Sequence, residues 1–223
     1  RPTRVFDASL LVLPVQHELT RHGAYAVHVG SAEVPAVLRV IGGDAIAPGA
    51  SGFVRIRTPR DLPLLPGDRY VLREHGRAET VGGGEVLDVA PSLRLSRAAP
   101  SISVDRVVAE RGWVTVDDLA ALTGERRAAT VGDWVVAPTV LQQVEHELRA
   151  AVAGAGVAGL DLAGLDPRRR AVLDTLDGVV TDAGRARIAG VVADDLRDHP
   201  YVAALAAAPF NPPSPEGVDR GQL

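Results

Sequence analysis

The chain has 223 residues, of which 46% are hydrophobic, and a formal net charge of −4, a balance typical of a globular protein with more than one small core. It contains no Cys, which excludes disulfides and thiolate metal sites. No apolar run reaches the roughly 18 residues of a membrane-spanning helix, and no cationic and apolar leader is visible. We therefore expect a cytoplasmic protein without membrane contact.

The charge is unevenly distributed along the chain. Residues 1–98 hold 12 Arg and 10 acidic residues, a net charge of +2, whereas residues 99–223 hold 12 Arg and 18 acidic residues, a net charge of −6. Phosphate attraction supplies most of the non-specific affinity for nucleic acids. The first part is therefore the better candidate for a polyanion contact.

Residues 1–90 have the pattern of a small antiparallel β-barrel. Short runs with alternating apolar residues occur at 4–14, 25–42 and 49–74, separated by turn residues and without a helical period. Phe53, Val54 and Ile56 interleave with Arg55 and Arg57, which predicts a half-buried strand with two guanidinium groups on its open face. The "LPGD" at 65–68 predicts a turn before a further strand.

The period changes after a linker rich in Pro, Ser and Ala, which we place at 91–100. Helical patterns follow, and the stretch "GWVTVDDLAALTG" (112–124) is echoed by "GVAGLDLAGLD" (156–166). Each helical stretch is followed by a predicted hairpin, at 130–138 and at 179–188. We therefore predict tandem winged-helix domains at 101–138 and 139–190, with a third, truncated one beginning in 191–223.

Three consecutive glycines in "REHGRAETVGGGEV" (73–86) raise the question of a phosphate-binding loop. Such a loop needs a Lys and a strand–loop–helix context, and the chain has no Lys. Gly82 to Gly84 lie between strand-like runs, where glycine marks a bulge, a bend or a close approach of two strands. We interpret them as a bend of the barrel.

The candidate binding residues are basic side chains of the barrel. Arg73, His75 and Arg77 flank the loop before the glycines, and Arg55 and Arg57 lie two apart on one strand face. One interpretation is a phosphate-contacting patch, which would position an RNA without reading its sequence. In the alternative, Arg55 and Arg57 pair with acidic residues of the barrel, such as Asp61, Asp68, Glu74 or Glu85.

No catalytic or metal-binding pattern is present. The six His residues include no i, i+4 pair and no HExxH motif, and no G-x-S-x-G sequence occurs. We therefore expect no enzymatic activity, metal or cofactor in this chain. "PRRR" (167–170) opens a predicted recognition helix, but Asp166, Asp174 and Asp177 beside it favour helix solvation or protein contacts over DNA reading.

The segments "HVGSAEVPAVL", "LPGDRYVLRE" and "ETVGGGEVLD" resemble the third domain of the elongation factor Tu superfamily. Together with the tandem winged helices, the chain is similar to part of the bacterial selenocysteine-specific elongation factors (SelB). The stretch 65–88 is the most specific part of this resemblance, and beyond residue 100 the similarity is one of architecture. The resemblance implies a fragment without the GTPase domain, which in this family binds GTP and Mg²⁺.

The resemblance also implies partners for the chain. They would be selenocysteine tRNA, the ribosome, the GTPase domain of the same protein and, through domains beyond this fragment, the mRNA hairpin that recodes UGA. It would give Arg55, Arg57, Arg73, His75 and Arg77 contacts to the T-arm of the tRNA. The alternatives are a winged-helix DNA-binding regulator and a purely structural arm for protein contacts.

Overall fold

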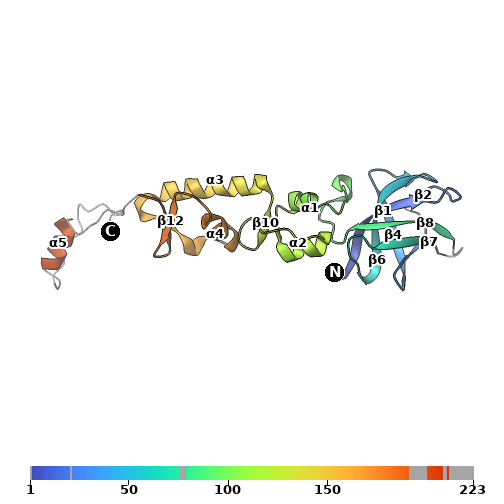
Figure 1. Ribbon diagram of the computed structural model, residues 1–223, viewed down its shortest axis with the longest axis horizontal. Coiled ribbons are helices and arrows are strands. Elements are labelled where there is room, and N and C mark those ends of the chain that lie inside the picture. Colours follow the sequence, from blue (N-terminus) through green and yellow to red (C-terminus); the bar gives the residue numbers. More distant parts are fainter. Residues whose placement is uncertain (1, 21, 76–78, 191–199, 208–209, 211–223) are drawn as a thin grey trace. The chain divides into compact units, whose positions relative to one another are not determined.

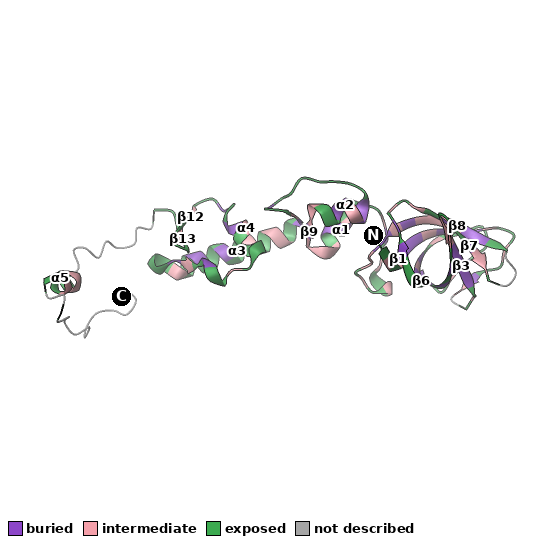
Figure 2. Ribbon diagram, turned by 90° about the horizontal axis from the view of Figure 1, so that it is seen from below, coloured by how far each residue is buried: buried purple, intermediate pink, exposed green. Residues whose placement is uncertain are grey.

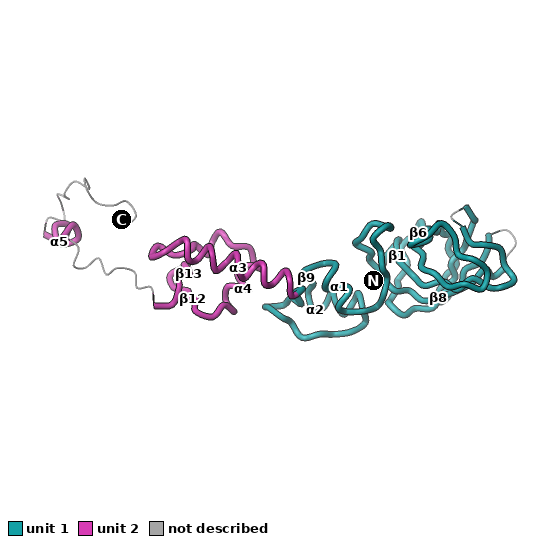
Figure 3. The backbone as a smooth tube through the Cα atoms, turned by 90° about the horizontal axis from the view of Figure 1, so that it is seen from above, with its two compact units in different colours: residues 1–137 teal, residues 138–223 magenta. Residues whose placement is uncertain are grey.

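The structure, a computed structural model, describes residues 2–20, 22–75, 79–190, 200–207 and 210. It divides into two compact units, residues 1–137 and residues 138–223, which Figure 3 colours separately. No helix within the described ranges combines the length and the apolar character that a membrane crossing requires.

The first unit begins with a closed barrel of six antiparallel strands, as the sequence predicts (Figure 1). Around the barrel the strand order is β1-β6-β4-β3-β7-β8. The strands are β1 (Pro2–Val12), β3 (Tyr25–Val29), β4 (Ala32–Ile41), β6 (Ser51–Pro63), β7 (Arg69–Glu74) and β8 (Thr80–Asp88). A separate two-stranded sheet joins β2 (Leu19–Thr20) to β5 (Ala45–Ile46).

Alternation along the strands fills the barrel. In β4, Val34, Ala36, Leu38 and Val40 are buried and the residues between them are exposed, which is the period of two expected for a strand with one face toward a core. The buried positions appear as the purple segments of the strands in Figure 2. Phe53, which the sequence pattern grouped with the core residues, is instead 43% exposed, because it shares the outward face of β6 with Arg55 and Arg57.

The three glycines lie inside the continuous strand β8 rather than at a bend between two strands. A Cβ atom on Gly84 would lie 1.9 Å from the carbonyl oxygen of Ser9, and one on Gly82 would lie 2.2 Å from that of Leu11. Both carbonyls belong to the neighbouring strand β1. The predicted close approach of two strands is therefore confirmed, although the strand does not end at the glycines.

Gly84 also lets an aromatic side chain cross strand β8. Tyr70 on β7 is the register partner of Gly84, and its hydroxyl donates a hydrogen bond of 2.7 Å to the carbonyl of Ser9 on β1. The ring therefore spans the strand at the position where no side chain is present. Burial raises the pKa of Tyr70, so the phenol stays protonated and keeps donating this hydrogen bond.

A small helical subdomain completes the first unit. It consists of η1 (Leu95–Arg97), α1 (Val104–Arg111), β9 (Trp113–Thr115), α2 (Val116–Thr123) and β10 (Trp134–Val136). Both ends of α2 are capped: the Thr115 hydroxyl accepts from the amide of Asp118, and Gly124 ends the helix in the left-handed conformation. Strand β10 pairs with β9, and the rings of Trp113 and Trp134 meet edge to face with centroids 6.0 Å apart.

The second unit is built on the long helix α3 (Pro138–Ala155). After it come η2 (Gly156–Ala158), β11 (Leu160–Asp161), η3 (Leu162–Gly164), α4 (Pro167–Leu173), β12 (Val179–Asp182), β13 (Arg185–Ile188) and α5 (Pro200–Ala207). The predicted hairpin 179–188 forms, and with β11 it makes a sheet of order β11-β13-β12. Asp166 caps α4 and Pro167 is its first residue, as the sequence predicts.

The two units differ in how far they match a winged helix. The second has a helix, a strand, a 3-10 turn, a helix and a two-stranded hairpin in that order, whereas residues 124–133 of the first form no helix. The winged-helix assignment therefore stays a prediction for both. Of the range predicted for a third domain, residues 191–199, 208–209 and 211–223 lie outside the described residues, and the described part is α5 and residue 210, so this domain also stays a prediction.

Candidate nucleic-acid interface

Arg57 lies on the outward face of β6, where the sequence places it. Its register partners are Val5 on β1 and Val37 on β4. The side chain is exposed, and no carboxylate or carbonyl among the described residues binds it. This guanidinium is therefore available to a ligand, as the phosphate-patch interpretation requires.

Arg57 and His75 line the same open groove, of about 470 Å³, on the surface of the barrel. Both residues are exposed, and the backbone amide of His75 donates 2.7 Å to the carbonyl of Ala24, which fixes the end of β7 beside the start of β3. The remaining lining is small or apolar: Gly23, Ala24, Tyr25, Pro35, Ala36, Val37, Thr58 and Pro59. The groove thus combines an apolar floor with basic groups, which suits a nucleic-acid backbone whose sugars are apolar and whose phosphates are anionic.

Tyr25 is the aromatic residue of this groove, and it is held in place. It is 8% exposed, and its hydroxyl donates 3.2 Å to the carbonyl of Thr20. Burial raises the pKa of Tyr25, so the phenol stays neutral and adds no negative charge beside the basic groups.

Arg55 does not share this availability, although it lies on the same strand face. Its Nε and Nη2 donate to the two carboxylate oxygens of Asp7 at 2.6 and 2.8 Å, and its Nη1 donates to the carbonyl of Leu93 at 2.9 Å. The side chain is only 17% exposed and that of Asp7 only 3%. The alternative interpretation, pairing with a barrel carboxylate, is therefore correct for Arg55.

The partner of Arg55 differs from the four acids that the sequence suggested. Asp61 pairs with Arg4, and Asp68 accepts a hydrogen bond from the amide of Leu65 in the predicted turn. Asp7 lies opposite Arg55 in the register of β1 and β6, 48 residues away in sequence. An RNA contact through Arg55 would require the bidentate bond to Asp7 to break, so the geometry does not favour it.

The other two predicted residues lie at the end of β7 and beyond it. Arg73 is half-buried and pairs in register with Ala26 on β3 and Thr80 on β8, next to a register shift. Arg73 takes part in a polar or electrostatic interaction, so it is not a free guanidinium. Arg77 lies outside the described residues. The structure therefore brings Arg57 and His75 together and leaves the role of the other predicted residues a prediction.

Arg39 is a basic residue that the sequence reasoning missed. It lies on β4 opposite Arg55, while Arg57 lies opposite Val37, so Arg39 and Arg57 are diagonal neighbours on one outward face. It is exposed, and within the described part of the chain it has no acidic partner. The signal was available, because Arg39 sits between Leu38 and Val40, two positions of the inward face.

Four of the described arginines of the second unit bind groups of the same unit. Arg169 of the "PRRR" segment pairs with Glu147 at 3.0 Å, and Arg149 donates to the carbonyl of Asp177. On the hairpin, Arg185 and Arg187 donate to the carbonyls of Val157 and Ala158 in η2 and of Gly159, which follows it. A wing whose guanidinium groups bind backbone carbonyls is a weak candidate for a DNA contact.

The three glycines of β8 do not fit the phosphates of a nucleotide. Gly82 to Gly84 have no positive φ and lie within a strand that is paired on both sides, so their amide groups do not form a loop around a phosphate. The GTP and Mg²⁺ of the resembling family therefore have no place at these glycines.

Comparison with known proteins gave two matches of interest. The chain is 32% identical over 92 residues to a selenocysteine-specific elongation factor of Desulfomicrobium baculatum, a match that covers 39% of this chain and 14% of that protein. A crystal structure of a bacterial selenocysteine-specific elongation factor, EF-Sec, aligns with a TM-score of 0.55 and 14% identity, covering 84% of this chain and 34% of that one. No family model matches the sequence.

These matches confirm the resemblance stated from the sequence. The chain is similar, in sequence over 92 residues and in fold over most of its length, to a part of selenocysteine-specific elongation factors. The matched parts are well below two thirds of either protein. What the whole proteins do is therefore a proposal for this chain.

Proposed function

We propose that this chain is part of a selenocysteine-specific translation elongation factor and that its barrel contacts the T-arm of selenocysteine tRNA. The observation that carries the proposal is the groove that exposed Arg57 and His75 line over an apolar floor, in a chain that is similar to part of that family. Arg39 extends the basic surface along β4. GTP and Mg²⁺ would be bound by a part of the protein outside these residues, and the ribosome would be a partner of the whole factor in the cytoplasm.

The helical segments are proposed as an arm rather than a second nucleic-acid surface. Among the described residues from α1 to β13, Arg170 is the single Arg for which no side-chain contact is found. In the family this arm would lead to the end that binds the mRNA hairpin. The same observation weighs against a DNA-binding regulator, which needs free basic side chains at its recognition helix and wing.

Binding of the chain to selenocysteine tRNA, an ordinary elongator tRNA and duplex DNA over a salt series tests the proposal. We expect a preference for selenocysteine tRNA, with log affinity falling by roughly 0.7–0.9 for each phosphate contact per unit of log salt. A preference for duplex DNA would favour the regulator. No binding to any of them at low salt would leave the arm for protein contacts as the better description.

A further inference from the structure

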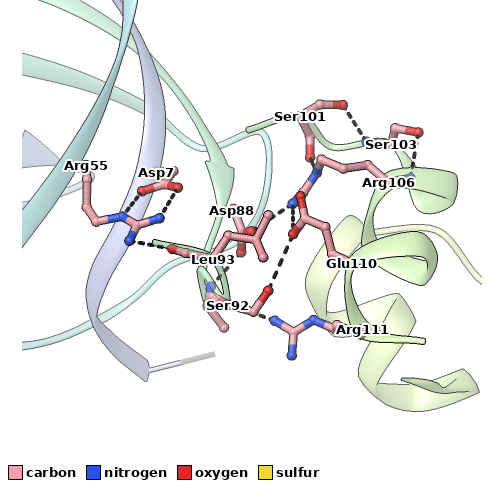
Figure 4. Close-up of polar contacts among 11 residues, drawn as sticks. Asp7, Arg55, Asp88, Ser92, Leu93, Ser101, Ser103, Arg106, Glu110 and Arg111 are labelled. Carbon is pink, nitrogen blue, oxygen red and sulfur yellow. Dashed lines mark hydrogen bonds and ion pairs between the residues drawn. The ribbon is translucent and has the colours of Figure 1, made fainter. Parts of the chain in front are cut away.

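The barrel and the helical subdomain of the first unit are joined by polar contacts as well as by the chain. On the barrel side, Arg55 binds Asp7 with two nitrogens and reaches the carbonyl of Leu93 with the third. Leu93 belongs to the segment 91–100, which the sequence marks as a linker. The barrel therefore holds this segment by its backbone (Figure 4).

On the helical side, Arg106 of α1 reaches back to the barrel. Its Nη1 donates to Asp88 at 3.1 Å and to Glu110 at 2.9 Å, and its Nε donates to the carbonyl of Ser101 at 2.8 Å. Asp88 is the last residue of β8 and is 4% exposed. The guanidinium thus links the last barrel strand, the end of the linker and helix α1.

Two further hydrogen bonds join helix α1 to the linker and to the residue before it. Arg111, at the end of α1, donates 2.6 Å to the carbonyl of Ala90, and the Ser92 hydroxyl donates 3.4 Å to Glu110. The side chains around this junction enclose no space large enough for a water molecule. The junction is therefore a packed joint and not a ligand site.

The charges of the joint are arranged across elements rather than within one. Asp7 and Asp88 are register partners on β1 and β8, and one Arg from each side approaches each of them. Taking either Arg away leaves a buried carboxylate without its cation, which is strongly unfavourable. Nη2 of Arg106 is buried without a hydrogen-bond partner among the described residues, and burying such a group costs free energy. The Arg106–Asp88 pair therefore contributes more to the orientation of the two elements than to stability.

We infer that Arg55 and Arg106 lock the barrel and helix α1 into one rigid body, with Arg106 as the positioning residue. The linker 91–100 is then held by hydrogen bonds to the carbonyl of Leu93 and to those of the flanking residues Ala90 and Ser101, and it is not a flexible connection. Any ligand that orients the barrel thereby also orients the first helical subdomain. The inference goes beyond the proposed function and does not depend on RNA binding.

A distance measurement between the two parts of the joint tests the inference. The chain has no Cys, so spin labels can be attached at Ser31→Cys, in the β3–β4 turn, and Asp133→Cys, beside β10, without removing any native thiol. Both positions are exposed and lie away from the joint. With the native joint we expect a single narrow distance distribution by pulsed electron paramagnetic resonance.

Arg106→Gln should abolish the narrow distribution while the circular dichroism spectrum stays unchanged. The matched control is Arg127→Gln, which removes an Arg that binds Asp105 on the same helix without touching the barrel and should keep the distribution narrow. If Arg106→Gln does not fold, Arg106→Lys decides, because it keeps a positive charge at the joint but loses the guanidinium that joins Asp88, Glu110 and the carbonyl of Ser101. A broad distribution with the native joint, or an unchanged one in the variant that folds, would overturn the inference.

Discussion

The barrel and the second unit use arginine in opposite ways. On the outer face of the barrel, Arg39 and Arg57 are exposed and have no carboxylate or carbonyl partner among the described residues, although Arg55 beside them is tied to Asp7. In the second unit, Arg149, Arg169, Arg185 and Arg187 all bind groups of that unit. Composition alone does not reveal this difference. Residues 1–98, which contain the barrel, and residues 99–223, which contain the second unit, hold 12 Arg each.

The difference shows that a charge pattern predicts a nucleic-acid surface only when the Arg side chains that bind groups of the protein itself are left out of the count. A guanidinium bound to a carboxylate or to several carbonyls has already lost part of its capacity for phosphate. Among the described residues, the barrel keeps Arg39 and Arg57 free of carboxylates and carbonyls, whereas in the second unit Arg149, Arg169, Arg185 and Arg187 are bound and Arg170 is not. The following experiments test this distinction.

The largest effect is expected for Arg55→Gln, which would break the buried pair. Asp7 would remain buried without its cation, and removal of one partner of a buried pair costs about 3–5 kcal/mol. Chemical unfolding followed by circular dichroism would measure it. The control is Arg57→Gln, two residues along the same face, whose exposed side chain should change stability by no more than about 0.5 kcal/mol. Equal effects at the two positions would show that the strand face is not divided as described.

The pH dependence of Arg55→Gln sharpens the same contrast. Burial raises the pKa of Asp7 and Arg55 opposes this, so the variant should raise that pKa further. A carboxyl with a raised pKa in the folded state binds more protons there than in the unfolded state, so stability falls as pH rises above the usual Asp range near 4. The deficit of the variant should therefore shrink between pH 7 and pH 5 by up to about 1.4 kcal/mol for each unit by which the pKa is raised. A deficit that is constant over this range would mean that Asp7 is not left charged and buried.

Glycines give a second contrast between the same two regions. Gly84→Ala would put a Cβ atom 1.9 Å from a backbone oxygen of β1, so we expect a loss of about 1–3 kcal/mol. Gly154 lies in α3 with nothing within 4 Å of an added Cβ, and Gly154→Ala should stabilise that helix by about 0.5–1 kcal/mol. Urea midpoints of the two variants would give both signs. A stabilising Gly84→Ala would contradict the close approach of β8 to β1.

Much of this architecture could be predicted from the sequence, because it is encoded locally. The alternation in β4, the Thr115 and Asp166 caps and the turn at 65–68 each depend on residues within a few positions of one another. The partner of Arg55 could not be predicted, since Asp7 meets it only through the register of two strands 48 residues apart. The link between Asp88 and Arg106 spans the linker and is equally invisible in a local pattern.

The candidate groove was predicted in part for the same reason. Arg57 was predicted from the alternation of its strand and His75 from its place in a loop, but only the strand order β6-β4-β3-β7 brings both to one groove. Local alternation would also have identified Arg39, yet it assigned Arg55 to the same surface. Whether an outward Arg is free depends on what packs over it, which here is the segment around Leu93.

The free and the bound guanidinium groups should differ in their effect on tRNA affinity. Arg57→Gln should weaken binding of selenocysteine tRNA and reduce the salt slope by roughly 0.7–0.9, the value for one lost phosphate contact. Arg169→Gln removes the same charge from a residue bound to Glu147 and should leave both quantities unchanged. Filter binding over a salt series measures them. Equal losses would mean that net charge, and not the groove, governs binding.

The smallest effect is expected for an ion pair that is exposed to solvent. Arg127 binds Asp105, but the two side chains are 41% and 80% exposed, so water screens the attraction and ordering two side chains opposes it. Arg127→Gln should therefore lower the free energy of unfolding by less than about 1 kcal/mol, well below the loss for Arg55→Gln. The urea midpoint measures this, and a loss as large as that of Arg55→Gln would show that solvent exposure does not separate the two kinds of pair. Both Arg residues sit in the same unit and bind one Asp each, so the contrast between them tests how burial and the bidentate bond of Arg55 together change what an arginine contributes to stability.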